Sequence, residues 1–183
     1  MPHRHGRSRP QRRSPAHRRR AGRSPRVDRV AARDGRVPRL PSAALHRAGF
    51  ANQPTSSHVD DGLRWSDAFI VAPCRCAPPE NWPEPEELRR CSVWLDGELG
   101  FLKKARVLLA LGSVGWEAAL GHFARRALVL PRPKPRFAHG AVLRLEGAPA
   151  LLGSYHVSQQ NTNTGKLTPA MLDEVLARAK ELF

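Results

Sequence analysis

The sequence predicts an α/β protein in which helices cover a layered, mostly parallel sheet. Short apolar runs alternate along the chain with segments whose apolar residues recur at helical spacing. An apolar run, a glycine-rich turn and a helical segment also follow one another directly in residues 106–116. Strands that alternate with helices are typical of layered α/β folds, which bind ligands at the carboxyl ends of their strands. We therefore expect functional side chains just after the strands.

Apolar runs in the folded part of the chain are predicted as strands. They cover residues 67–73, 106–111, 141–145 and 150–155. The first run is stopped by Pro73. The second leads into a turn at residues 112–115, after which a helix is predicted to begin near Trp116. The second run, the turn and the helix form one strand–turn–helix unit.

Two further helices are predicted from periodicity and capping. The apolar residues of the first recur at spacings of three and four: Leu88, Cys91, Leu95, Leu99 and Leu102. This spacing places Cys91 on the inward face. The second helix has Thr168 as its N-cap and Pro169 as its first residue. Its apolar stripe consists of Leu172, Val175, Leu176, Ala179, Leu182 and Phe183.

Most of the excess positive charge lies at the beginning of the chain. The chain has 31 Lys plus Arg and 16 Asp plus Glu, and its first 39 residues hold 14 Arg and two acidic residues. No Leu, Ile, Phe, Tyr, Trp or Cys precedes Leu40, so this segment cannot bury enough apolar surface to offset its ordering entropy. We expect residues 1–42 to be a disordered Arg- and Pro-rich segment and residues 43–183 to form the folded domain.

The basic segment has two readings. A basic arm would attract phosphate without reading base sequence. A transit peptide would also be Arg-rich and poor in acidic residues, although this segment lacks an amphipathic apolar face. The most apolar window, residues 107–119, is interrupted by Glu117 and is too short to span a bilayer. We therefore expect no membrane association.

The cysteines are Cys74, Cys76 and Cys91. Without a secretory signal they predict a reducing compartment rather than a disulfide framework. Thiolates bind zinc or iron–sulfur clusters, which normally take four ligands. A cysteine on the apolar face of a helix is more often a small core residue. Residue spacing alone leaves both readings open.

A long polar stretch at residues 153–165 directly follows the last predicted strand and contains His156. It holds one imidazole together with several amides and hydroxyls. A solvated turn is one reading. The other is a ligand site, because the strand delivers a titratable side chain to its carboxyl end, and neighbouring Gln and Asn can hydrogen-bond bases.

Three stretches of the sequence together resemble a known family. They are Arg75-Cys76-Ala77-Pro78-Pro79-Glu80-Asn81, Ala110-Leu111-Gly112 and Tyr155-His156-Val157-Ser158-Gln159-Gln160-Asn161. They resemble the type-5 uracil-DNA glycosylases, and the similarity extends from about Ala44 to Phe183. The resemblance implies a four-stranded parallel sheet between helices and a [4Fe–4S] cluster. It also implies an enzyme of base excision repair that hydrolyses N-glycosidic bonds to remove uracil or other deaminated bases from DNA.

The resemblance also assigns residues. It makes His156 the catalytic histidine, and Cys76 and Cys91 two of the four cluster ligands, while Cys74 has no ligand counterpart. The residues that enter the DNA beside the flipped nucleotide are Ser158, Gln159, Gln160 and Asn161. A histidine near the base carbonyl can stabilise the negative charge that develops on the departing base.

Basic residues that could neutralise DNA phosphates precede the third predicted strand. They are Arg132, Lys134 and Arg136, for which a solvated basic turn is the other reading.

The resemblance stops in front of Ala44. The Cys-x-x-Cys pair and the Gly-Leu-Ala-Pro-Ala stretch with which the family begins do not occur between Met1 and Ser42. Because a GC-rich gene read out of frame yields Arg, Pro, Ala, Gly and Ser, our hypothesis is that this segment comes from a shifted reading frame. The family reading predicts a bacterial, cytoplasmic, nucleoid-associated monomer acting on DNA. The alternative is a catalytically inactive nucleic-acid-binding protein with a degenerate glycosylase fold.

Overall fold

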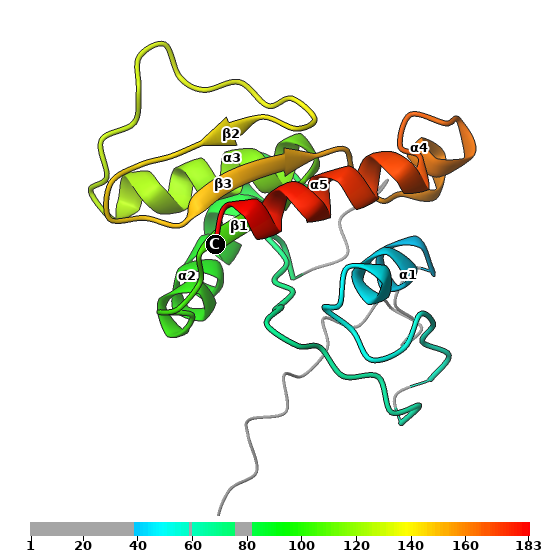
Figure 1. The fold of residues 1–183 in the computed structure, drawn as a ribbon. Coiled ribbons are helices and arrows are strands. Elements are labelled where there is room, and N and C mark those ends of the chain that lie inside the picture. The colour runs from blue at the N-terminus through cyan, green and yellow to red at the C-terminus, as the bar shows by residue number, and fades with distance from the viewer. Residues whose placement is uncertain (1–38, 59, 76–81) are drawn as a thin grey trace, which may run out of the picture.

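The computed structural model describes residues 39–58, 60–75 and 82–183 (Figure 1). Most of the segment that the sequence predicts to be disordered lies outside the described residues, as does Cys76. The first described helix, α1 (Arg39–Arg47), begins inside the predicted segment 1–42, and residues 39–42 of that segment are helical. None of the helices in the described residues is long and apolar enough to cross a membrane.

The described residues form one mixed sheet. Its strands are β1 (Val107–Leu111), β2 (Val142–Leu143) and β3 (Ala150–Ser154), in the order β1-β3-β2. β1 runs parallel to β3, and β2 runs antiparallel to it. The predicted α/β class is confirmed, whereas the four-stranded, mostly parallel sheet is not, because the described part holds three strands. Among these strands, the two outer ones, β1 and β2, each have a neighbour on one side only.

The strand predicted at residues 67–73 is wrong. The backbone there forms no strand, and the nearest pairing is an isolated bridge between Ala51 and Trp65. Asp67 has a φ of 54°, which takes the chain out of the extended conformation at the start of the run. Phe69 and Ile70 remain 38% and 37% exposed, so the run does not supply a buried sheet position. A short apolar run is ambiguous because its sequence does not show whether a partner strand lies beside it.

The other predicted helices and strands form, with shifted boundaries. The helices after α1 are α2 (Pro85–Phe101), α3 (Gly112–Arg125), α4 (Gln159–Asn163) and α5 (Pro169–Glu181). The turn predicted at residues 112–115 is instead the first turn of α3. Gly112 has a φ of 86°, which lets the chain pass from β1 into the helix without a connecting loop. The sequence did not predict α4, which lies within the polar stretch 153–165.

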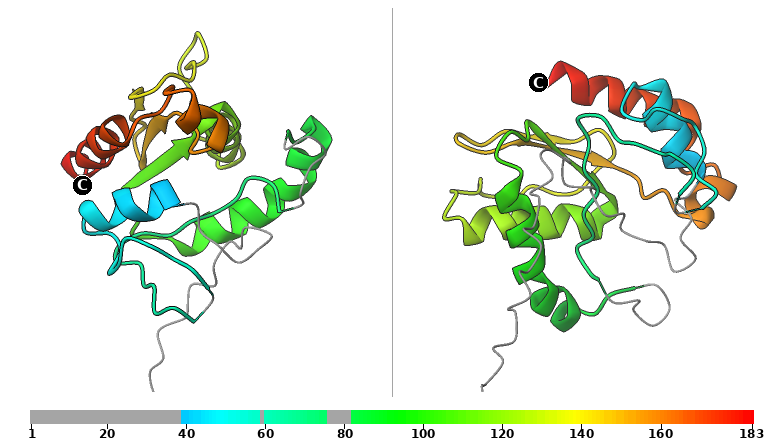
Figure 2. Two further views of the ribbon diagram at one scale, coloured as in Figure 1. Left: turned by 90° about the vertical axis from the view of Figure 1, so that its right-hand side faces the viewer. Right: turned by 90° about the horizontal axis from the view of Figure 1, so that it is seen from below.

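Alternate residues of β3 face opposite helices, and this gives the layers seen in Figure 2. Leu151 packs with Trp116 and Phe123 of α3 on one face of the sheet. Leu152 packs with Val175 of α5 on the other face. Both leucines are fully buried. The helix α1 packs beside α5 and extends that second layer. The core therefore fixes the position of β3 between two helices.

The helix α2 is tied to α3 by a charged cluster. Arg125 Nε donates to Asp96 Oδ2 at 2.6 Å, and His122 Nδ1 lies 2.6 Å from Asp96 Oδ1. The Arg125 guanidinium, aided by His122, holds the pKa of Asp96 below its usual value. Cys91 and Leu95 are the buried residues of α2, which confirms the predicted inward face.

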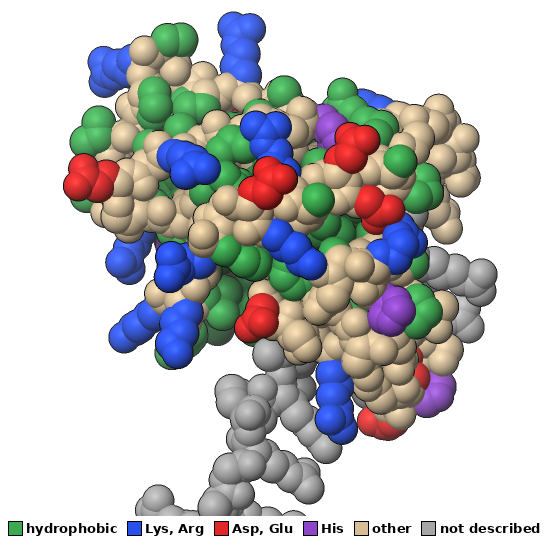
Figure 3. All heavy atoms as spheres, viewed as in Figure 1, with side chains coloured by type: hydrophobic (Ala, Val, Ile, Leu, Met, Phe, Trp, Pro, Cys, Tyr) green, Lys and Arg blue, Asp and Glu red, His purple; other side chains and the backbone are tan. Residues whose placement is uncertain are grey.

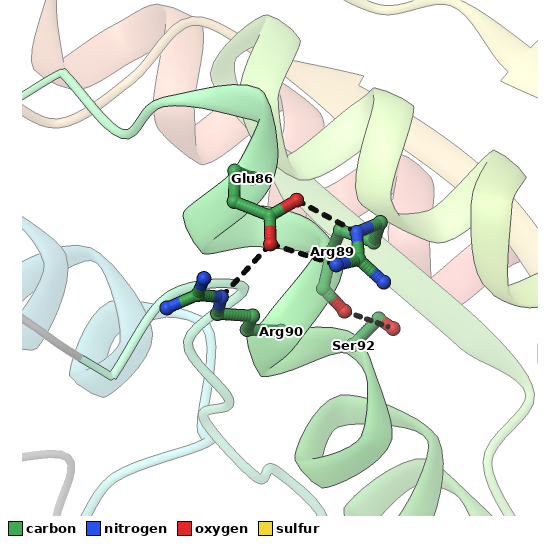
Figure 4. Close-up of polar contacts among 4 residues, drawn as sticks. All are labelled: Glu86, Arg89, Arg90 and Ser92. Carbon is green, nitrogen blue, oxygen red and sulfur yellow. Dashed lines mark hydrogen bonds and ion pairs between the residues drawn. The ribbon is translucent and has the colours of Figure 1, made fainter.

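An ion-pair network covers the first turns of α2 (Figure 4). The Glu86 carboxylate accepts hydrogen bonds from Arg89 at 2.7 Å and from Arg90 at 2.8 Å. Hydrogen bonds from Arg89 and Arg90 lower the pKa of Glu86 to about 2. Acidic and basic side chains are also interspersed over the face that carries α5 (Figure 3), so that face presents no uniform positive surface.

Thr168→Ala is expected to destabilise the protein by about 1 kcal/mol. The Thr168 hydroxyl accepts a hydrogen bond from the Met171 amide at 3.2 Å, and the variant leaves this amide at the start of α5 without its acceptor. Urea unfolding of the two proteins measures the difference. The control is Thr168→Ser, which keeps the hydroxyl and should retain most of the stability. Equal losses in both variants would show that the cap is not the cause.

Candidate functional site

The carboxyl ends of the two parallel strands lie side by side. Leu111, the last residue of β1, pairs in register with Ser154, the last residue of β3. The next residues are Gly112 on one strand and Tyr155 followed by His156 on the other. A Cβ at position 112 would lie 3.1 Å from the His156 Cβ, so glycine admits the histidine here. The predicted catalytic candidate therefore lies at the strand ends, where the fold class predicts a site.

His156 is packed on one side and exposed on the other. The backbone of Gly112 lies against the base of the side chain, while part of the ring remains open to solvent. Partial burial lowers the pKa of His156 from its usual value. The ring is therefore neutral at neutral pH. A neutral imidazole donates a hydrogen bond from one nitrogen and accepts one at the other.

The four predicted DNA-binding residues form the start of α4. The Ser158 hydroxyl caps this helix by accepting a hydrogen bond from the Asn161 amide at 3.3 Å. The Asn161 side-chain amide donates to the carbonyl oxygen of His156 at 2.9 Å, and the backbone carbonyl of Asn161 accepts from the Leu167 amide at 3.0 Å. Asn161 thus ties α4 to the backbone of the histidine. The side chains of Gln159 and Gln160 are exposed.

A group of rings surrounds Tyr155, directly before His156. The His139 ring stacks on the Tyr155 ring with 4.8 Å between centroids, and the Phe137 ring meets it edge-on at 6.3 Å. The Lys166 Nζ lies 5.3 Å from the centre of the same ring. Residue spacing did not single out His139 or Lys166. An antiparallel pairing of the two last predicted strands would have pointed to His139, because it brings the chain just before β2 back to the end of β3.

The basic residues predicted to contact phosphate are partly engaged elsewhere. Lys134 forms an ion pair with Glu117 of α3. The carbonyl of Pro135 accepts a hydrogen bond from the Trp116 indole at 3.1 Å, which holds this segment against α3. Lys166, whose Nζ lies over the Tyr155 ring, lines the same open groove as His156.

The groove at the strand ends gathers the polar residues of the site. It is lined by Gly112, His156, Ser158, Gln159, Gln160, Asn161 and Lys166, and continues past the apolar side chains of 68–72. A concave surface with an imidazole, several amides and the Lys166 ammonium can hold a base by hydrogen bonds and a phosphate by charge.

Comparison with known proteins identifies the family. The family model described as "Uracil DNA glycosylase superfamily" matches residues 24–180, which is most of the chain. The chain belongs to this superfamily. The match begins inside the segment 1–42 that the sequence places in front of the glycosylase-like domain.

The relatives of this superfamily member include curated type-5 enzymes. It is 49% identical over 141 residues to the type-5 uracil-DNA glycosylase of Mycobacterium tuberculosis, covering 76% of this chain and 51% of the relative. It is 49% identical over 138 residues to that of Thermus thermophilus, covering 75% and 60%. A type-4 uracil-DNA glycosylase of Pyrobaculum aerophilum is 34% identical over 82 residues, covering 44% and 41%. The chain thus spans between about half and three fifths of the length of its type-5 relatives.

The glycosylase resemblance also implies an iron–sulfur cluster, which four cysteine thiolates would hold. This chain has three cysteines. Cys91 is buried on α2, Cys74 is half-buried, and Cys76 lies outside the described residues. Within the described ranges, no three or more metal-binding side chains gather in one place. Three cysteines are one fewer than the four thiolates such a cluster takes, and cluster binding through Cys76 and Cys91 stays a prediction.

Proposed function

We propose that this chain carries the catalytic histidine of a DNA glycosylase that excises uracil or other deaminated bases. The observation that supports this most directly is the position of His156. It lies beside Gly112 at the ends of two parallel strands, in a chain 49% identical to type-5 uracil-DNA glycosylases over 141 residues. As a monomer on bacterial DNA, the protein would work in the cytoplasm at the nucleoid.

The chemistry of the site fits base release. When the N-glycosidic bond breaks, its electron pair goes to the base nitrogen and positive charge develops on the sugar carbon. Water then adds to that carbon and loses a proton, which leaves a free base and an abasic sugar. The neutral ring of His156 can donate a hydrogen bond to the base carbonyl and so stabilise the developing anion.

The residues of α4 would hold the DNA open during this reaction. Extruding a base from the duplex costs on the order of a few kcal/mol. The exposed amides of Gln159 and Gln160 can fill the gap and hydrogen-bond the base that loses its partner. Asn161 is held to the His156 carbonyl, so α4 and the histidine would engage the DNA as one unit.

A glycosylase assay tests the proposal. The full chain, prepared from cells without their own uracil-DNA glycosylase, is incubated with end-labelled duplex DNA that contains one uracil. Alkali then cleaves the strand wherever a base has been released. We expect cleavage at the uracil and none in the matched thymine duplex.

The same duplexes discriminate the non-enzymatic alternative. A binding protein acting through its basic segment would bind uracil and thymine duplexes equally, release no base and lose affinity steeply with salt. That result would overturn the proposed enzymatic function.

A further inference from the structure

The end of β3 is held by a histidine from a distant part of the chain. β3 ends at Ser154, so the Tyr155 amide is the first beyond the strand. This amide donates a hydrogen bond to His139 Nδ1 at 3.1 Å. Because Nδ1 accepts here, the ring carries its proton on Nε2. In a longer strand, the carbonyl of a neighbouring strand would accept from this amide. Here the His139 side chain supplies the acceptor instead.

The segment that carries His139 is itself fixed against β3. The Gly140 amide donates to the Gly153 carbonyl at 2.7 Å, and the Gly153 amide donates to the Ala141 carbonyl at 2.8 Å. The chain also passes so close that a Cβ at position 153 would lie 2.5 Å from the Ala138 carbonyl oxygen. Backbone contacts on both sides of His139 therefore leave its ring little freedom to move.

Two contacts join the His139 side chain to Tyr155, one to its ring and one to its backbone amide. Their rings stack at an interplanar angle of 22°, in addition to the hydrogen bond to the Tyr155 amide. The next residue along the chain is His156, whose α-carbon is one peptide unit, about 3.8 Å, from that of Tyr155. The direction in which His156 leaves the strand therefore depends on the Tyr155 peptide that His139 holds.

We propose that His139 is a positioning residue for His156 and acts through the Tyr155 backbone. The proposal rests on the proposed function in so far as it concerns base release. Catalytic groups must be held to within roughly half an ångström of their productive position. A displacement of about 1 Å can slow a reaction by about 100-fold. Loss of the His139 acceptor should therefore reduce the rate of the chemical step more than it weakens DNA binding.

Two substitutions separate the hydrogen bond from ring packing. In His139→Asn the side-chain oxygen occupies the place of Nδ1, so the acceptor is kept and the stacked ring is lost. In His139→Phe the ring is kept and the acceptor is lost. Phe137→Leu serves as the matched control, because it removes a ring beside Tyr155 without touching the hydrogen bond.

The first measurement is single-turnover release of uracil, together with DNA affinity. His139→Phe should release uracil about 10- to 100-fold more slowly with nearly unchanged affinity. His139→Asn and Phe137→Leu should stay close to the wild-type rate. Equal rate losses in His139→Asn and His139→Phe would reduce His139 to a packing role and overturn the proposal.

The second measurement does not depend on activity. An NMR coupling across the hydrogen bond between the Tyr155 amide and His139 Nδ1 should be present in the wild-type protein, and its absence would overturn the proposal. In His139→Phe the ring signals of His156 should shift, whereas in Phe137→Leu they should not. If the wild type releases no uracil, the proposed function fails, and the NMR comparison still decides whether His139 positions His156.

Discussion

His156→Ala is expected to slow uracil release by about 100- to 1,000-fold, the loss typical when one donor to a developing anion is removed. The neutral ring stands at the carboxyl end of β3, and among the described residues no other histidine lines the groove at the strand ends. Alanine leaves the backbone and Gly112 unchanged and removes only the donor. Single-turnover kinetics on the uracil duplex measure the effect.

The control for this variant is His46→Ala, which removes an exposed histidine at the end of α1. It should release uracil at the wild-type rate. Circular dichroism and urea unfolding should show both variants folded. Unchanged release by His156→Ala would remove this histidine from the mechanism.

The lowered pKa of His156 adds a pH signature. The unfolded chain takes up this proton near the ordinary histidine value of about 6.5, whereas the folded chain takes it up only at lower pH. As the pH falls below about 6.5, proton uptake by this side chain therefore favours unfolding. The stability of His156→Ala should fall less with pH in that window than the stability of the wild type.

Gly153→Ala is expected to destabilise the protein by about 3 kcal/mol, at the upper end of overpacking substitutions. The new methyl group would lie 2.5 Å from the Ala138 carbonyl oxygen and 3.4 Å from the rings of Phe137 and Trp116. The nearest clash is with backbone, so no side-chain rotation relieves it. Urea unfolding measures the loss, and base release should fall as well because the segment of His139 is pushed from β3.

The control is Gly97→Ala on α2, where a Cβ meets nothing within 4 Å. Alanine favours a helix interior over glycine by about 1 kcal/mol, so this variant should be as stable as the wild type or more stable. A Gly153→Ala protein as stable as the wild type would contradict the close approach of residue 138 to β3.

The elements that the sequence predicted well are those whose signals are local. The cap of Thr168 and the proline after it mark the start of α5, and the periodicity around Cys91 marks the inward face of α2. These signals depend on neighbours within a few residues. The start of α3 was misplaced because glycines are typical of turns, whereas Gly112 uses its positive φ inside the junction of strand and helix.

The features that the sequence did not predict depend on distant partners. The run 67–73 has the composition of a strand, but pairing requires a second strand, which the run does not find among the described residues. His139 is separated from Tyr155 by 16 positions, and only the pairing of β2 with β3 makes them neighbours. By contrast, His156 and Asn161 are five positions apart and are joined by a hydrogen bond inside the polar stretch that the sequence singled out.

The one-sided pairing of β1 affects how the chain behaves in concentrated solution. A strand with unpaired amides and carbonyls along one edge is a template on which another chain can add a strand, and apolar side chains strengthen such contacts. Val107, Leu108 and Leu109 of β1 are only partly covered. Within the described part of the protein, this edge is one at which two copies could pair, so dilute handling should reduce aggregation.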